Sequence, residues 1–193
     1  MSASRLILVK HAMPVVDGSV PATEWQLSEG GREAARELAA ELKRYEPFFV
    51  VSSIEPKAWE TAAILAQRLR VPCAAVAGLH EHERPTPGLD TREQFQANVR
   101  ALFERPDGLV FGAETANQAR ARFVAAVEDA LAWWGSRAPS EGEQSLVAVA
   151  HGTVITLLCE AWCGVEPFPF WEALGLPSYV VLSLPERRLL HGP

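Results

Sequence analysis

The chain has 193 residues, of which 48% are hydrophobic and 22% charged, a composition typical of a globular rather than a disordered protein. Its 18 basic side chains oppose 24 acidic ones, so the formal net charge is −6. This balance excludes a protein whose whole surface binds nucleic acid or anionic lipid, and any positive site must be local. At about 150 residues per domain, the length predicts a single domain over residues 1–193.

The cysteines and the apolar runs predict the cellular compartment of the protein. Cys73, Cys159 and Cys163 are an odd number in a chain too large to need disulfides, which predicts free thiols in a reducing compartment. The apolar run over 6–9 is too short for a signal peptide, and no run approaches the roughly 18 to 20 apolar residues that span a bilayer. We therefore expect a cytoplasmic protein with no membrane or nucleic-acid partner.

The first part of the chain alternates between two patterns. Runs that are apolar on both faces predict buried strands, and apolar residues spaced three and four apart predict helices. In chain order these elements are a strand over 6–9, a helix from 28 to near 47, a strand over 48–51, a helix over 56–69 and a short strand over 73–76. Ser28 suits the N-cap of the first helix and Pro56 the first turn of the second.

The alternation resumes after a polar, proline-rich segment over 80–88, which we expect to be a surface loop. The later elements are helices over 91–103 and 115–134, a strand over 146–150, a helix over 154–162 and a strand over 179–184 at the edge of the sheet. The apolar segment 168–171 looks exposed, which would favour a homodimer contact. Together the elements predict an α/β fold, a three-layer α/β/α sandwich with a largely parallel central sheet.

Two histidines directly follow predicted strands. His11 lies two residues after the first strand, and His151 comes immediately after the strand over 146–150. Because ligands of open α/β sheets bind at the carboxyl ends of the strands, both imidazoles are expected at one edge, where they could meet. Gly152 opens the next helix, whose N-terminus favours an anion such as phosphate. Lys10 and Lys57 add positive charge at the same edge.

Other interpretations of these residues remain open. A lone histidine after a strand is commonly a packed loop residue, and a lone lysine is commonly a surface residue; only their shared position favours a site. The run His80-Glu81-His82-Glu83 invites a metal site, since alternate residues of an extended segment share a face. No further ligand cluster is evident, so no metal is expected.

Five segments resemble one family in the family's own order. Leu8-Val9-Lys10-His11-Ala12 resembles the Arg-His-Gly strand end of the histidine phosphatase superfamily, which includes cofactor-dependent phosphoglycerate mutases. The others resemble its Leu-Thr-x-x-Gly helix start (27–32), its Ser-Ser-x-x-x-Arg-Ala-x-x-Thr-Ala block (52–62), its Leu-x-Glu loop (79–81) and its strand ending in Ser-His-Gly (147–152). The resemblance spans about 6–184 and implies a phosphoglycerate mutase-like fold.

The resemblance implies covalent phosphohistidine chemistry. His11 would accept the phosphoryl group, because a neutral imidazole is a good nucleophile near pH 7. Glu81, with Glu83 as the nearby alternative, would protonate the leaving oxygen and later activate water. His151 would act beside His11 on the developing charge. Neither a metal nor an organic cofactor is required for hydrolysis.

The implied phosphate site departs from the family pattern. Lys10, Lys57, His151 and Gly152 would bind the phosphoryl oxygens, but the family has arginine at the first two positions. Lysine keeps the charge and loses the planar fork that grips two oxygens, so we expect weaker binding and slower turnover. Asp17 lies where the mutase-like pattern often has asparagine and would repel phosphate unless it turns away.

Three functions follow from this site. The first is a phosphomonoester hydrolase acting on a small phosphorylated substrate, with reduced efficiency. The second is a degenerate member that binds a phosphorylated ligand or partner without turnover, as the lysines suggest. The third is a phosphoglycerate-type mutase, disfavoured because the segment between Glu81 and Glu114 is short for the capping insertion expected of a true mutase.

Overall fold

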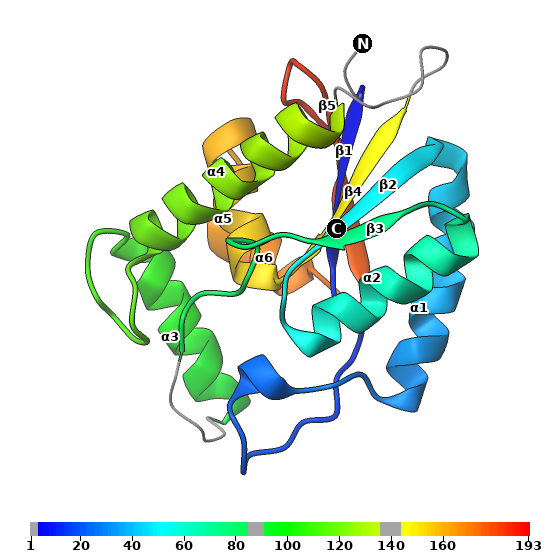
Figure 1. The fold of residues 1–193 in the computed structure, drawn as a ribbon. Coiled ribbons are helices and arrows are strands. Elements are labelled where there is room, and N and C mark those ends of the chain that lie inside the picture. The colour runs from blue at the N-terminus through cyan, green and yellow to red at the C-terminus, as the bar shows by residue number, and fades with distance from the viewer. Residues whose placement is uncertain (1–3, 85–90, 136–143) are drawn as a thin grey trace.

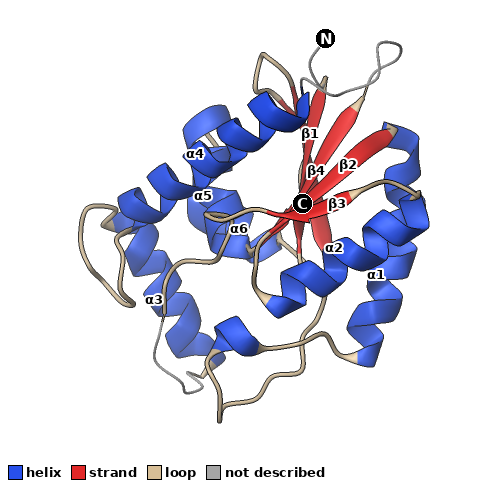
Figure 2. Cartoon of the chain, viewed as in Figure 1, coloured by secondary structure: helices blue, strands red, loops and turns tan. Residues whose placement is uncertain are grey.

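A computed structural model describes residues 4–84, 91–135 and 144–193. Within these ranges six strands form one sheet in the order β3-β2-β4-β1-β5-β6 (Figures 1 and 2). The strands are β1 (Arg5–Lys10), β2 (Pro47–Ser52), β3 (Cys73–Ala75), β4 (Ser145–Ala150), β5 (Ser178–Ser183) and β6 (Leu189–His191). The first four strands run parallel to one another, and β5 and β6 are antiparallel to their neighbours.

Helices cover both faces of this sheet. Their bounds are η1 (Ala22–Glu24), α1 (Glu29–Leu42), η2 (Lys43–Tyr45), α2 (Pro56–Leu69), α3 (Arg92–Glu104), α4 (Ala116–Gly135), α5 (Gly152–Cys163) and α6 (Pro167–Ala173). Along β1, Ile7 and Val9 pack with α1 and α2, whereas Leu6 and Leu8 pack with α3 to α6 on the other face. All four are fully buried. The predicted three-layer α/β/α sandwich with a largely parallel sheet is therefore confirmed.

Local chemistry explains where the helices that frame the site begin. The Ser28 hydroxyl accepts a hydrogen bond from the Gly31 amide at 3.0 Å and so caps α1. Pro56 occupies the first turn of α2, where its missing N–H would have had no helical partner. His151 is the N-cap residue of α5, so the first backbone amides of that helix, which have no partner within the helix, follow it directly.

Two predictions about the C-terminal part are wrong, and one lies partly outside the described residues. The segment 168–171 is not an exposed patch: it belongs to α6, where Pro167 begins the helix and Phe168 is buried against the core. β5 is not an edge strand, because the short β6 pairs with its free side. Of the loop predicted over 80–88, positions 85–88 fall outside the described ranges.

Candidate active site

The two histidines predicted to meet do lie side by side. β1 and β4 are neighbours in parallel register, with Lys10 opposite Ala150, so His11 and His151 leave the sheet at the same edge. The His11 backbone amide still donates to the Ala150 carbonyl at 3.0 Å, which continues the pairing by one residue. The centroids of the two imidazole rings are 5.1 Å apart, with 61° between the ring planes.

The contacts of His11 determine which ring nitrogen is free. Nδ1 lies 2.8 Å from the carbonyl oxygen of Ala12. A carbonyl can only accept, so Nδ1 carries the proton and Nε2 keeps a lone pair. Burial lowers the pKa of His11 to about 4, and the charges of Lys57 and Lys10 act in the same direction. At neutral pH the ring is therefore uncharged, with Nε2 available as a nucleophile.

His151 is fully buried beside it. Its Nε2 is hydrogen-bonded with the Ser53 hydroxyl at 2.9 Å. Its Nδ1 is buried and has no hydrogen-bond partner within the described part of the chain, which is uncommon for a buried polar atom. Burial, followed by the neighbouring His11 and Lys57, holds the pKa of His151 well below its ordinary value of 6.5.

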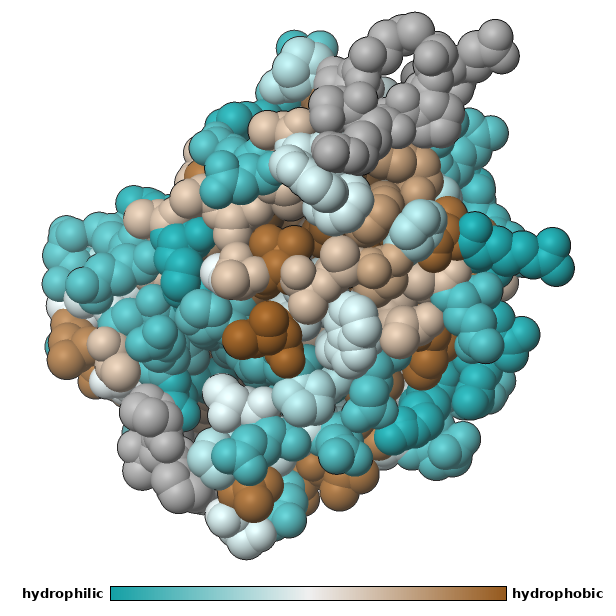
Figure 3. Space-filling model, viewed as in Figure 1, coloured by the Kyte–Doolittle hydropathy of each residue, from teal (hydrophilic) through white to brown (hydrophobic). Residues whose placement is uncertain are grey.

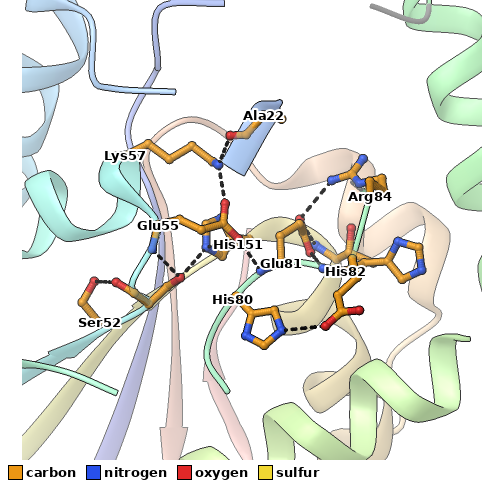
Figure 4. A network of polar contacts seen from close by, with 12 residues as sticks. Ala22, Ser52, Glu55, Lys57, His80, Glu81, His82, Arg84 and His151 are labelled. Atoms are coloured by element: carbon orange, nitrogen blue, oxygen red, sulfur yellow. Dashed lines mark hydrogen bonds and ion pairs between the residues drawn. The ribbon is translucent and has the colours of Figure 1, made fainter. Parts of the chain in front are cut away.

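Lys57 reaches the site together with a residue that the sequence analysis missed, Glu55. The Lys57 ammonium donates to Glu55 Oε2 at 2.5 Å and to the Ala22 carbonyl at 2.6 Å (Figure 4). Glu55 Oε1 accepts from the Glu81 amide at 2.8 Å and lies 3.5 Å from His151 Nε2. The Glu55 and Lys57 side chains are only 5% and 6% exposed, so this ion pair is shielded from water.

The local fold explains the position of Glu55. It is the N-cap residue of α2, with extended backbone angles (φ −69°, ψ 135°), and its amide donates to the Ser53 hydroxyl at 3.2 Å. Pro56 then starts the helix, which places Lys57 in its first turn. The available sequence signal was a carboxylate two residues before a phosphate-site lysine, a spacing that lets both side chains reach one point.

Glu81 rather than Glu83 lies in this network. Its Oε1 accepts from the His82 amide at 2.8 Å, and its Oε2 accepts from the Thr153 amide at 3.2 Å, in the first turn of α5. Arg84, a cation that sequence analysis also missed, lies 3.8 Å from Oε2. Burial opposes the charge on Glu81, but Arg84, His151 and the two amides together hold its pKa below the ordinary value. Glu83 is half exposed and faces His80 at 3.4 Å.

Lys10 is directed differently from Lys57. Its ammonium donates to the Leu174 carbonyl at 2.9 Å, at the C-terminal end of α6. Burial lowers the pKa of Lys10, while the Glu81 charge acts in the opposite direction. Gly152 makes room for this arrangement, because a Cβ there would lie 3.2 Å from Lys10 Cε and 3.3 Å from Trp171 Nε1.

The surroundings of the site include an acidic residue that turns away and several exposed apolar side chains. Asp17 accepts from the amide and hydroxyl of Ser19 and is exposed, so its carboxylate is satisfied within its own turn. Figure 3 shows apolar side chains scattered among polar ones on the viewed face. Five large apolar residues are exposed in the segments that come after two of the strands. Met13, Val15 and Val16 come after β1, and Ile54 and Trp59 come after β2.

The described residues contain no group of three or more His, Cys, Asp or Glu side chains placed to hold a metal ion. Over the same ranges no helix is both long enough and apolar enough to cross a membrane.

The fold and the paired histidines place the chain in a known class of α/β enzymes. The model of the histidine phosphatase superfamily (branch 1) matches residues 6–188. The chain belongs to that superfamily.

Solved structures agree with this assignment. The mycobacterial glucosyl-3-phosphoglycerate phosphatase Rv2419c is 28% identical with a TM-score of 0.73, and the match covers 93% of this chain and 90% of that one. Its complex with inorganic phosphate gives 29% identity and a TM-score of 0.71, covering 94% and 90%. Bacillus stearothermophilus YhfR, at 21% identity, shares the fold with a TM-score of 0.71, covering 98% and 95%. No curated protein sequence matches this chain significantly. The superfamily and the similarity to the Rv2419c phosphatase support a phosphatase-type function.

Proposed function

We propose that the protein is a phosphomonoester hydrolase that works through a phosphohistidine on His11. The observation that carries this proposal is the juxtaposition of the His11 and His151 rings, 5.1 Å apart at the carboxyl edge of the sheet. A neutral nucleophile, a second buried imidazole with an open nitrogen and a helix N-terminus meet there. That combination suits a tetrahedral anion undergoing in-line transfer.

In the first step, His11 Nε2 attacks phosphorus and forms a P–N bond while the bond to the leaving oxygen breaks. Nδ1 keeps its proton and its bond to the Ala12 carbonyl, which stabilises the positive charge that the ring acquires. Lys57 and His151 lie near His11, where they stabilise charge on the equatorial oxygens.

Glu81 is the proposed acid and base. In the ligand-free chain its lowered pKa keeps it ionised at neutral pH. A phosphoryl dianion beside it, competing for the Thr153 amide, favours its protonated form, which can then protonate the leaving oxygen. In the second step the same carboxylate removes a proton from the water that breaks the P–N bond and releases phosphate.

We propose a small phosphorylated substrate and slow turnover. Rv2419c is described as a glucosyl-3-phosphoglycerate phosphatase, which supports a small phosphorylated metabolite rather than a polymer. Slow turnover follows from the two lysines: Lys10 is bound to the Leu174 carbonyl and Lys57 to Glu55, so neither presents a free bidentate donor. A chain that binds phosphate without turnover is the second candidate, favoured by the same two contacts.

The test traps the intermediate. Purified protein is incubated with a ³²P-labelled aryl phosphate, quenched, and divided between acid and alkaline washes. We expect protein-bound label that survives alkali and is lost in acid, together with release of inorganic phosphate. His11→Ala should remove both, whereas His191→Ala, which alters an exposed imidazole on β6, should retain both. Full activity of His11→Ala would falsify the assignment, and phosphate binding without label or release would favour the second candidate.

A further inference from the structure

One carboxylate of the site, that of Glu55, lies among groups that are suited to holding an anion. Three groups suited to holding phosphoryl oxygens converge on the Glu55 side chain: the Lys57 ammonium, the His151 ring and the Glu81 amide (Figure 4). Oε2 accepts from the Lys57 ammonium, and Oε1 accepts from the Glu81 amide and lies 3.5 Å from His151 Nε2. This arrangement is expected around a bound oxyanion: two oxygens are surrounded by a positive side chain, an imidazole and a backbone amide.

We propose that Glu55 is a resident anion of the phosphate site. Its carboxylate takes the place of phosphoryl oxygens in the ligand-free chain and has to release Lys57 and His151 when a phosphorylated ligand binds. The inference rests on the proposed function and adds a determinant of affinity to it.

Burial explains why the two anions compete. Lys57 has 6% of its side chain exposed and Glu55 5%, so water screens their interaction poorly. Lys57 and Glu55 neutralise each other, and a phosphoryl dianion brought to the same ammonium would lie against a like charge. The backbone of Glu55 is held by Ser53 and by the start of α2, so the side chain has to move while the helix stays.

The competition also predicts what restoring the family arginine would do. Lys57→Arg would present its fork to the Glu55 carboxylate, which accepts a bidentate guanidinium as well as a phosphate does. Glu55 therefore has to be neutralised before arginine at position 57 can tighten phosphate binding. We expect little gain from Lys57→Arg alone and a larger gain when it is combined with Glu55→Gln.

The experiment measures the affinity for inorganic phosphate by titration calorimetry. The native chain is compared with Glu55→Gln, which keeps the shape and removes the charge, and with Glu55→Leu, which removes every polar contact. Glu24→Gln is the matched control, because it removes one negative charge from an exposed position in η1, two residues from Ala22. We expect phosphate to bind Glu55→Gln at least about tenfold more tightly than the native chain, with Glu24→Gln within about twofold.

The direction of the change separates this role from a structural one. Loss of a merely structural contact would leave Lys57 misplaced and weaken phosphate binding, whereas removal of a competing anion strengthens it. Circular dichroism is used to check that each variant is folded. If Glu55→Gln does not fold, the comparison is made with Glu55→Leu instead. Unchanged or weaker binding by a folded variant overturns the inference.

The outcome also distinguishes the two proposals. A native chain that forms the acid-labile phosphoenzyme, together with a Glu55→Gln variant that shows no gain, would leave the proposed function standing and remove Glu55 as a competing anion. Absence of phosphate binding and of turnover in every folded variant would refute both.

Discussion

Acidification should destabilise the protein through His11. The ring is buried without a positive charge, and its pKa is lowered from 6.5 to about 4 by burial. Between these values the unfolded chain binds a proton that the folded chain does not. The stabilising contribution is therefore complete above about pH 6.5 and is lost as the pH falls toward 4. The difference between a pKa of 6.5 and one of about 4 corresponds to about 3 kcal/mol, of which about 2 kcal/mol is lost by pH 5.

The assay is urea unfolding of the native chain and of His11→Asn at pH 7.5 and pH 5. Asparagine does not titrate, so the native chain should lose about 2 kcal/mol more than the variant between the two conditions. At a typical slope of about 2 kcal/mol per molar urea, this is a difference of about 1 M in the shift of the midpoint.

His191→Asn is the control, because this exposed residue should leave the native pH dependence unchanged. If the free energy of unfolding fell by the same amount for the native chain and for His11→Asn between pH 7.5 and pH 5, the argument that a neutral, buried imidazole occupies position 11 would be refuted.

Three further predictions test the fold and the site. Gly31→Ala should destabilise the protein by several kcal/mol in thermal unfolding, because the new Cβ would lie 2.1 Å from the Met13 carbonyl oxygen. Gly30→Ala should instead stabilise α1 by about 0.5–1 kcal/mol, because nothing lies within 4 Å of a Cβ there. Glu81→Gln should lower kcat for alkyl phosphates about 10²- to 10⁴-fold, and Glu83→Gln should change it less than threefold; equal effects would contradict the proposed acid. Lys10→Met should cost about 1–3 kcal/mol in urea unfolding by leaving the Leu174 carbonyl without this donor, and an unchanged midpoint would show that this bond contributes nothing.

The meeting of His11 and His151 was predictable because it depends on topology alone. Both residues follow buried parallel strands, and the carboxyl ends of such strands share one edge of the sheet whatever their order. The start of α2 was predictable for a similar reason, since Pro56 marks a first helical turn by its own covalent structure. These features follow from backbone geometry, which local sequence determines well.

The direction of long side chains was not predictable in this way. Lys10 remains a predicted phosphate ligand and its side chain lies beside Gly152, but the bond of its ammonium to the Leu174 carbonyl could not be predicted, because the sequence pattern did not reveal α6. Glu55 was not identified from the sequence, because only the tertiary arrangement brings His151 and the Glu81 amide to it. The direction of a flexible side chain depends on which partners the tertiary fold places near it, and these partners can be far away in the sequence.

The Glu55–Lys57 pair links the stability of the site to its affinity. A buried ammonium without a partner is costly, and removing one member of a buried ion pair typically destabilises by about 3–5 kcal/mol. Glu55→Gln should therefore unfold at a lower temperature than the native chain in phosphate-free buffer. Phosphate would replace the missing anion on Lys57, so saturating phosphate should raise the unfolding temperature of Glu55→Gln more than that of the native chain. Equal phosphate-induced shifts, measured by differential scanning calorimetry, would mean that Glu55 and phosphate do not share Lys57.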